Sequence, residues 1–464
     1  MTTAKTTDLA DEQESRKSRE QPDHAQGEPR STHQRDQDDP IAYPEGGWSA
    51  WSVVLGSWMA CFGTMGLMNC LGIFQAYLEE HELRQYSSGQ VGWIFGLYTF
   101  LAFFCGIQVG PIFDAKGPRA LVVCGAIGTI LFLVLLGFCT AYWHFMLVFG
   151  VLGGASLSLA FNPAISIVAH YFHRRRGLAT GVASSGGSFG GLVFPLLFQH
   201  VASRIGFAWA TRVIALVDLI TFSIAILLIR PRNPRRSATL GAILPDLSVF
   251  RDRALMLASM GIFFMEWGLF VPVTYLTSYA LLHGLPSGFA FLLLSLINAG
   301  AIFGRWIPGY CADRIGRFNT LIITILGCLL CVCCLWIPAA SSKPVITIFA
   351  LLFGFASGSN VSLAPVCIGQ LCKLETYGRY YATAYVIVSI RYVSRLFPVF
   401  RRQEIANVSS CLTGIPIAGQ ILSTCNGEYR GLIAFTAANY AASLVCLVIT
   451  KLFCCGWTQF KAIF

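Results

Sequence analysis

Charged side chains are scarce in this chain: only 12% of its 464 residues are charged, while 55% are hydrophobic. Soluble domains carry roughly 25% charged residues, so these are too few to cover a surface that faces water. Apolar segments long enough to span a bilayer recur along the whole length. The composition therefore argues against a soluble enzyme and predicts an all-α integral membrane protein.

Enzyme and cofactor motifs are also missing. There is no phosphate-binding glycine loop followed by Lys and Ser or Thr, which argues against an ATP-driven pump. Cys328, Cys331, Cys333 and Cys334 lie in an apolar run without the polar groups that support metal ligands. We expect no enzymatic activity, cofactor or metal. For Cys454 and Cys455, both an unmodified and a palmitoylated state stay open.

An apolar signal-peptide core is absent from residues 1–46, which contain 6 Lys and Arg against 11 Asp and Glu. This composition predicts a disordered tail, after which the first helix serves as an uncleaved anchor. The rest of the chain contains 27 basic and 12 acidic residues. Because the basic residues lie in short loops between apolar runs, they indicate membrane topology and not nucleic-acid binding.

About twelve membrane-spanning helices are expected, with an irregular eleventh. The predicted spans are 49–76, 90–113, 119–140, 143–170, 178–201, 207–229, 255–281, 286–309, 319–338, 344–371, 380–390 joined to 412–423, and 431–453.

The loops between these spans alternate in charge. One set (114–119, 173–176, 230–254, 313–317 and 373–379) contains 15 Lys and Arg, and the alternate set contains 4. The positive-inside rule assigns the basic set, and both termini, to the cytoplasm. Residues 230–254 form the linker between two halves, 47–229 and 255–464.

The two halves repeat a loop sequence. GPIFDAKGPR begins at Gly110 and GYCADRIGR begins at Gly309, and their aspartates are 199 positions apart. These loops resemble the signature of the major facilitator superfamily, which implies that fold with two six-helix halves. In that family such loops hold one conformation and are released during transport. The residues expected to gate this chain are Asp114, Arg119, Asp313, Arg314 and Arg317.

Within that superfamily the chain resembles the fungal form of the monocarboxylate porter branch. The motifs are EGGWSAW, from Glu45 to Trp51, and YFHRRRGLATGVASSGGSFGG, from Tyr171. Trp48 and Trp51 are expected to be interfacial anchors. Small residues in the second motif predict a face for close helix packing. They are Gly181, Ser184, Gly187, Gly190 and Gly191.

Arg305 is the strongest candidate for binding substrate. It lies in an apolar helix and matches an arginine that the family directs toward an anionic substrate; a structural or snorkelling role stays open. The family's carboxylate one turn earlier is replaced by Ala301, and a lysine of its animal members by Asn69. Both proton-linked groups are therefore missing, so a substrate other than lactate becomes plausible.

Other polar residues inside the predicted spans could contribute. Asn69, Asn162 and Asn298 are candidates for substrate binding, and Glu266 and Asp218 for proton coupling. Each could instead be a structural hydrogen-bonding group.

Residues 391–410 interrupt helix eleven with several charges and Pro398. Each central charge costs about 2.5–3.5 kcal/mol on insertion scales. The codons for Arg391 to Val393 can contain a splice-donor-like string, which suggests a translated intron. A genuine insertion that keeps its charges hydrated is the alternative.

The resemblance implies a secondary active transporter that takes up or exchanges a monocarboxylate-like anion, with symport as one expected mode. We expect it in the plasma membrane. One alternative is efflux of a fungal secondary metabolite, and another is a non-transporting sensor or an inactive mis-spliced product. The expected partners are a small-molecule substrate and the lipid bilayer, without nucleic acid; an accessory subunit stays open.

Overall fold

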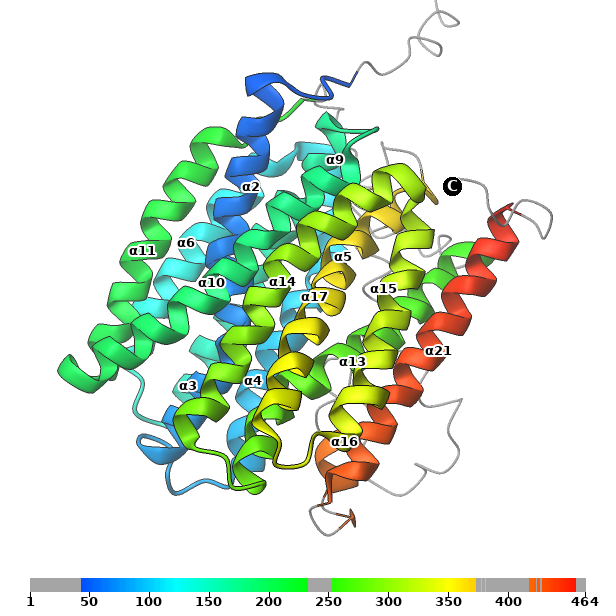
Figure 1. Cartoon of the computed structure of the whole chain (residues 1–464). Helices are drawn as coiled ribbons and strands as arrows, with labels where there is room; N and C mark the ends of the chain where they lie inside the picture. Colours follow the sequence, from blue (N-terminus) through cyan, green and yellow to red (C-terminus); the bar gives the residue numbers. More distant parts are fainter. Residues whose placement is uncertain are drawn as a thin grey trace, which may run out of the picture. The chain divides into compact units, whose positions relative to one another are not determined.

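The computed structural model describes residues 43–232, 252–372, 377, 380, 417–422, 424–425 and 428–455. The regular structure in these ranges is helical, and the helices belong to one unit that begins at Tyr43. Long helices run side by side in Figure 1. The predicted tail, most of the linker and the 391–410 insertion lie outside the described residues, so those predictions stay untested.

The first group of helices covers the chain up to residue 228. It consists of α2 (Gly47–Met68), α3 (Leu71–Glu80), α4 (Ser88–Phe104), α5 (Gly106–Lys116), α6 (Pro118–Leu136), α7 (Tyr142–Phe145), the π-helix η1 (Met146–Gly153), α8 (Gly154–Ser166), α9 (Val168–Tyr171), α10 (Arg176–Ile205) and α11 (Phe207–Leu228).

The second group begins after the linker. It consists of α13 (Arg253–Leu282), α14 (Ser287–Ile315), α15 (Arg317–Cys331), the π-helix η3 (Val332–Trp336), α16 (Ile337–Ala339), α17 (Lys343–Ile368) and α21 (Tyr429–Cys455).

Eleven helical segments of the described chain are long and apolar enough to cross a membrane. They overlap eleven of the twelve predicted spans. The remaining one, 380–390 with 412–423, lies almost entirely outside the described residues. The prediction of an all-helical, polytopic membrane fold is confirmed.

Glycines form the two repeated loops. Gly117 separates α5 from α6 with φ 81°, and Gly316 separates α14 from α15 with φ 100°. Positive φ favours glycine because it has no Cβ. The sequence repeat therefore encodes the same sharp helix-to-helix turn twice.

Buried apolar side chains form two clusters. One runs from Ala50 to Ile229, and the other, apart from Ala169, from Leu255 to Leu447. We call α2–α11 the first half and α13–α21 the second half. The most extensive packing between the halves is made by α10 and α14.

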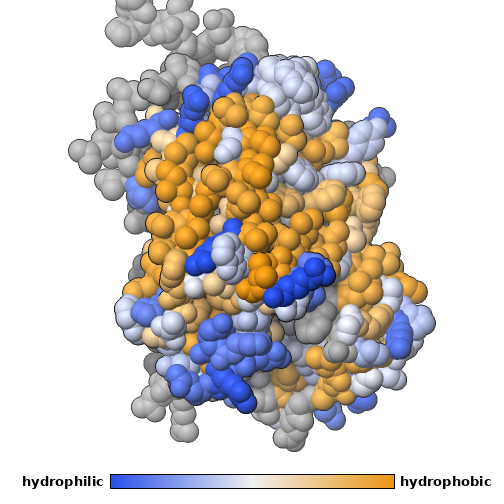
Figure 2. Space-filling view, turned by 90° about the vertical axis from the view of Figure 1, so that its left-hand side faces the viewer, coloured by the Kyte–Doolittle hydropathy of each residue, from blue (hydrophilic) through white to orange (hydrophobic). Residues whose placement is uncertain are grey.

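Apolar side chains also cover much of the outside. Leu131, Leu216, Leu227, Ile323 and Val445 are each more than 45% exposed. Figure 2 shows one face whose upper half is largely hydrophobic, with hydrophilic residues at its upper rim and over parts of its lower half. A soluble protein rarely exposes so large an apolar surface, whereas lipid chains are its natural solvent.

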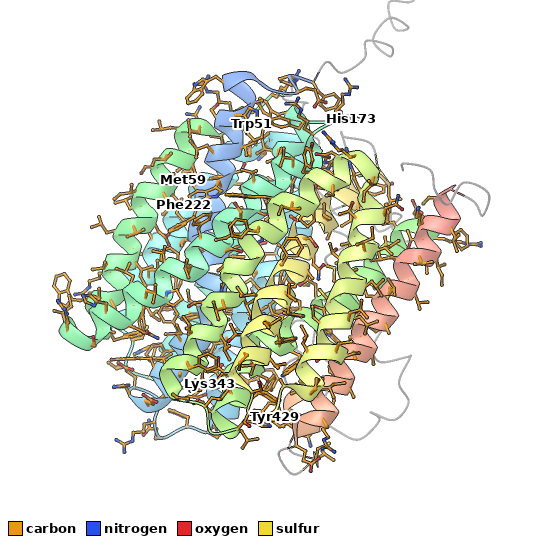
Figure 3. All side chains as sticks on the ribbon, in the orientation of Figure 1. Trp51, Met59, His173, Phe222, Lys343 and Tyr429 are labelled. Carbon is orange, nitrogen blue, oxygen red and sulfur yellow. The ribbon has the colours of Figure 1, made fainter. Side chains whose placement is uncertain are left out.

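The two ends of the helices differ in charge. We call the end that contains 173–176 and Arg317 the basic end. In Figure 3 His173 lies at this end, and Lys343 and Tyr429 lie at the other. Trp48 is 83% exposed near the start of α2, as suits an anchor at the membrane surface.

Candidate functional site

Glycines bring α10 into backbone contact with α14. A Cβ atom on Gly177 would lie 2.6 Å from the carbonyl oxygen of Gly309, and one on Gly181 would collide with the carbonyl oxygen of Arg305. Gly190 packs in the same way against Phe62 and Gly66 of α2. The predicted small-residue face is confirmed, and it holds α10 between α2 and α14.

Arg305 lies within this crossing. Its side chain is 5% exposed, and Nη1 donates a hydrogen bond to the carbonyl oxygen of Ser184 in α10. The Nε atom has no hydrogen-bond partner among the described residues. The guanidinium is therefore buried between the two halves and does not extend to a membrane surface, as a snorkelling arginine would.

Asn69 and Asn298 meet next to the same crossing. The Asn69 amide nitrogen donates to the carbonyl oxygen of Gly187 at 3.0 Å and to Oδ1 of Asn298 at 3.2 Å. Gly191 leaves the space for this pair, because a Cβ there would lie 2.7 Å from both the Asn298 oxygen and the Asn69 Cβ. Two of the predicted binding residues, one directly after α2 and one in α14, are thus in direct contact.

Gly187 connects this pair to Arg305. Its carbonyl group binds Asn69, and a Cβ on it would lie 3.3 Å from Nη1 of Arg305. Asn298 and Arg305 are seven residues apart, so they share one face of α14. We call Asn69, Gly187, Asn298 and Arg305 the central site.

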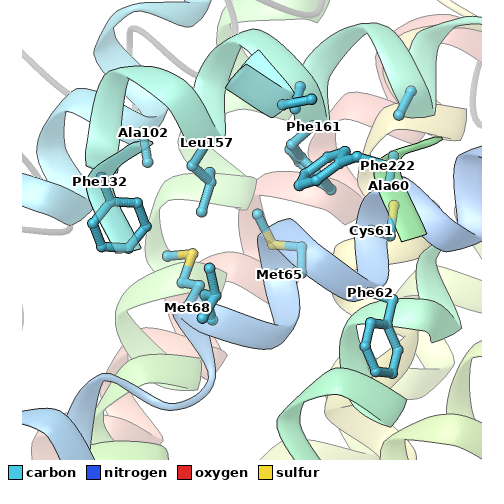
Figure 4. Packing of buried hydrophobic residues seen from close by; sticks show 14 of the residues in the cluster. Ala60, Cys61, Phe62, Met65, Met68, Ala102, Phe132, Leu157, Phe161 and Phe222 are labelled. Atoms are coloured by element: carbon cyan, nitrogen blue, oxygen red, sulfur yellow. The ribbon is translucent and has the colours of Figure 1, made fainter. Parts of the chain in front are cut away.

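The central site has the chemistry for a small organic anion. A guanidinium can hold a carboxylate with two parallel hydrogen bonds, and amides both donate and accept. Its surroundings are apolar. Cys61 and Met65 of α2 lie among the buried hydrophobic side chains in Figure 4, and Met65 packs against Gly187.

Asn162 lies elsewhere in the first half. Its amide nitrogen donates to the backbone oxygen and to Oγ of Ser158, one turn earlier in α8, and it packs against Gly106 of α5. None of its hydrogen bonds within the described part of the chain reaches the central site. These local contacts are also what a structural asparagine makes.

The two acidic candidates lie in different halves. Asp218 of α11 is fully buried against Gly63 of α2, and neither carboxyl oxygen has a hydrogen-bond partner among the described residues. Glu266 of α13 is 3% exposed. Burying an unpaired ionised carboxylate is costly, so Asp218 needs an explanation beyond packing. No contact in the described chain connects either residue with Arg305.

At the basic end, the side chain of Asp313 in α14 contacts the start of α10. Its two carboxylate oxygens accept hydrogen bonds from the backbone N–H groups of Gly177 at 2.7 Å and Leu178 at 2.9 Å. A carboxylate is favoured there by the unpaired N–H groups and the positive end of the helix dipole. Arg317 adds a bond from Nη2 to the carbonyl oxygen of His173, at 2.5 Å.

Glu45 is a second carboxylate at the start of α10. One of its oxygens accepts from the N–H groups of His173 and Arg174, at 2.9 and 2.7 Å, and the other from Arg175 at 3.4 Å. The sequence motif marked Glu45 but gave it no partner. An acidic residue preceding two glycines was the signal, and the contact over 128 positions was not predictable.

The other predicted gating residues have different surroundings. The guanidinium of Arg314 lies 4.5 Å from the ring of Tyr310 in its own helix. Arg119 is exposed at the start of α6, and Asp114 is half-buried near the end of α5. Burial raises the pKa of Cys372 to about 12; the charge of Arg176 opposes this shift, and that of Asp114 adds to it. Asp114 thus lies near the chain that follows α17.

Among the described residues, no group of three His, Cys, Asp or Glu side chains is arranged so that it could bind a metal ion. The cysteines described there are free thiols. Cys454 is half-buried at the end of α21.

The family profile and the similar proteins agree on one family of transporters. The sequence profile of the Major Facilitator Superfamily matches residues 53–394. A riboflavin transporter of Saccharomyces cerevisiae is 32% identical over 93% of this chain and 84% of its own length. An aspyridones efflux protein of Emericella nidulans is 35% identical over 72% of this chain and 68% of its own.

A solved structure shares the fold. The crystal structure of a human organic anion transporter superposes with a TM-score of 0.65, covering 87% of this chain and all of that one. The sequence identity is 15%, so this similarity concerns the arrangement of helices only.

Proposed function

Because the chain belongs to the major facilitator superfamily of membrane transporters, we propose that it is a secondary active transporter that works by alternating access. Its cargo is a small organic molecule that binds between the two halves. Transporters built from such repeats bind their substrates near the middle of the membrane, at the interface of the repeats.

The observation that supports this proposal best is the position of Arg305. A buried guanidinium at the crossing of α10 and α14, whose Nε atom has no partner in the described part of the chain, is costly unless it serves a purpose. Asn298, two turns earlier in α14, and Asn69, which donates a hydrogen bond to it, supply neutral polar groups. This combination suits an organic anion with further polar atoms better than a bare inorganic ion.

The composition of the site favours a monocarboxylate-like anion larger than lactate. In the monocarboxylate porters that the chain resembles, a carboxylate and, in animal members, a lysine stand where this chain has Ala301 and Asn69, and both are linked to proton-coupled transport of lactate. Ala301 is 6% exposed and packs against Gly358 of α17. Proton coupling, if used, would then depend on Glu266 or Asp218.

Efflux of a fungal secondary metabolite is the second candidate. The similarity to an aspyridones efflux protein favours it, and the similarity to a riboflavin transporter shows that relatives handle ring systems larger than lactate. A central site with one cation and two amides is compatible with either direction of transport.

The change between the two alternating-access states would be controlled by contacts at the basic end. Asp313 and Arg317 connect the second half to the start of α10, and these contacts must break if the halves separate there. We propose that this end faces the cytoplasm, on the basis of the charge difference between the loops, and that the protein lies in the plasma membrane.

Flux measurements on the full chain test this function. Accumulation of a labelled monocarboxylate, driven by a pH gradient across sealed vesicles, would support uptake. Retention of a secondary metabolite in cells after gene deletion would support efflux. If neither flux exists but deletion alters signalling, the transporter proposal is wrong and a sensor replaces it.

A further inference from the structure

A pocket of about 540 Å³ opens at the basic end, away from the central site. The first half contributes Tyr43, His173, Arg174 and Arg176, and the second half contributes Asp313, Arg317, Gly369 and Gln370 among others. The pocket therefore lies across the boundary between the halves.

Three arginines and one aspartate line this pocket. The carboxylate of Asp313 is occupied by two backbone N–H groups of α10, and the nearby carboxylate of Glu45 by three. Both acidic groups thus accept these hydrogen bonds from the start of α10, and of the three arginines Arg317 is the one whose charge Asp313 partly offsets. The pocket keeps an excess of positive charge.

Arg176 is the most deeply buried of the three. Its side chain is 5% exposed, and its Nη2 atom has no hydrogen-bond partner among the described residues. The guanidinium lies 4.4 Å from the centre of the Tyr377 ring. A buried cation that retains an unused donor is costly unless an anion binds beside it.

The rest of the pocket offers an aromatic wall. The rings of Tyr43 and His173 lie 5.2 Å apart and both line it. Ligand pockets typically measure about 300–1,000 Å³, so there is room here for more than an inorganic ion. Arginines match phosphate geometry, and aromatic rings pack against flat organic groups.

We propose that this pocket binds the phosphate group of an organic molecule, with its organic part against Tyr43 and His173. The phosphate would bridge Arg174 and Arg176 of one half and Arg317 of the other. Since the ligand contacts both halves, it would bind best when the basic end is closed, and it would hold the transporter in that state. The site is regulatory and separate from the cargo site.

Binding can be measured on the full chain in nanodiscs of phosphatidylcholine, by isothermal titration with adenosine diphosphate. We expect binding of adenosine diphosphate at constant ionic strength and none of adenosine. Arg176→Gln, and Gln370→Glu, which adds a carboxylate to the wall, should each weaken binding by about tenfold or more. Arg175→Gln is the matched control, because Arg175 is exposed and does not line the pocket.

A lipid headgroup is the other source of such a phosphate. If adenosine diphosphate fails, nanodiscs with 5% phosphatidylinositol bisphosphate (roughly one such lipid in twenty) should raise the unfolding temperature of the wild-type chain and not that of Gln370→Glu. Either positive result supports the phosphate site. The proposal is overturned if neither probe acts, or if Arg175→Gln weakens binding as much as Gln370→Glu does.

Arg305→Gln separates this site from the cargo site. The variant should lose transport and still bind the phosphate probe with wild-type affinity. If Arg305→Gln loses both transport and binding of the phosphate probe, there is one site and not two. That result would contradict the proposal.

Discussion

Asn69 and Asn298 are 229 positions apart in the sequence, and their side-chain amides are hydrogen-bonded at 3.2 Å. One lies at the end of α2 in the first half, and the other in α14 of the second. If the halves move relative to each other, this bond is among those that must change. It therefore provides a direct probe of coupling between the halves.

A double-mutant cycle on this pair should reveal a coupling. We expect Asn69→Ala and Asn298→Ala to be non-additive in the free energy of unfolding by about 0.6 kcal/mol, which is typical of hydrogen bonds between membrane helices. Thermal unfolding of the four proteins in one detergent gives the measurement. Strict additivity would mean that the bond contributes nothing in the membrane protein.

Gly187→Ala should damage the central site by overpacking. The new Cβ would collide with Met65 and lie 3.3 Å from Nη1 of Arg305. Such overpacking costs about 1–3 kcal/mol, so the unfolding temperature and the transport rate should both fall. Gly72→Ala serves as the control, because a Cβ there meets no atom within 4 Å. Equal effects of the two changes would show that overpacking at Gly187 does not explain the loss.

Asp313→Asn should loosen the start of α10. The amide has one accepting oxygen where the carboxylate has two, and it carries no charge for the helix dipole. Hydrogen exchange of the peptide that contains Gly177 and Leu178 should quicken by about tenfold, since a bond to a charged group contributes about 1.5–3 kcal/mol. Arg314→Gln, which alters the stacking on Tyr310, should leave that peptide unchanged.

Glu45→Gln tests the second carboxylate at α10. Loss of its charge next to three backbone N–H groups should lower stability by about 1 kcal/mol and quicken hydrogen exchange at 173–175. The exchange at Gly177 and Leu178, which bind Asp313, should change little. A slow-down or no change at 173–175 would contradict the assigned role of Glu45.

The local features of this molecule could be predicted because they depend on short patterns. The length of the apolar runs predicted the spans, the repeated sequences from Gly110 and Gly309 predicted two equivalent loops, and the small residues of α10 predicted its packing face. Arg305 could be selected because an arginine in an apolar helix is costly wherever it lies.

Contacts between distant segments could not be predicted in the same way. The bonds from Glu45 to 173–175, from Asp313 to Gly177 and from Asn69 to Gly187 depend on how the helices cross, which no local pattern contains. Arg176 was interpreted only as a topology signal, as part of a basic cluster. Its burial follows from tertiary packing against the chain beyond α17.

The central claim is that Arg305 binds the cargo between the two halves. Arg305→Gln should lower kcat/KM for the transported molecule by at least about tenfold, because it removes a charge-assisted hydrogen bond, while the protein remains folded by thermal unfolding. Arg212→Gln is the matched control, since Arg212 stacks on Phe138 and Trp209. Unchanged transport kinetics in Arg305→Gln, in a vesicle assay where the wild-type chain is active, would contradict the account.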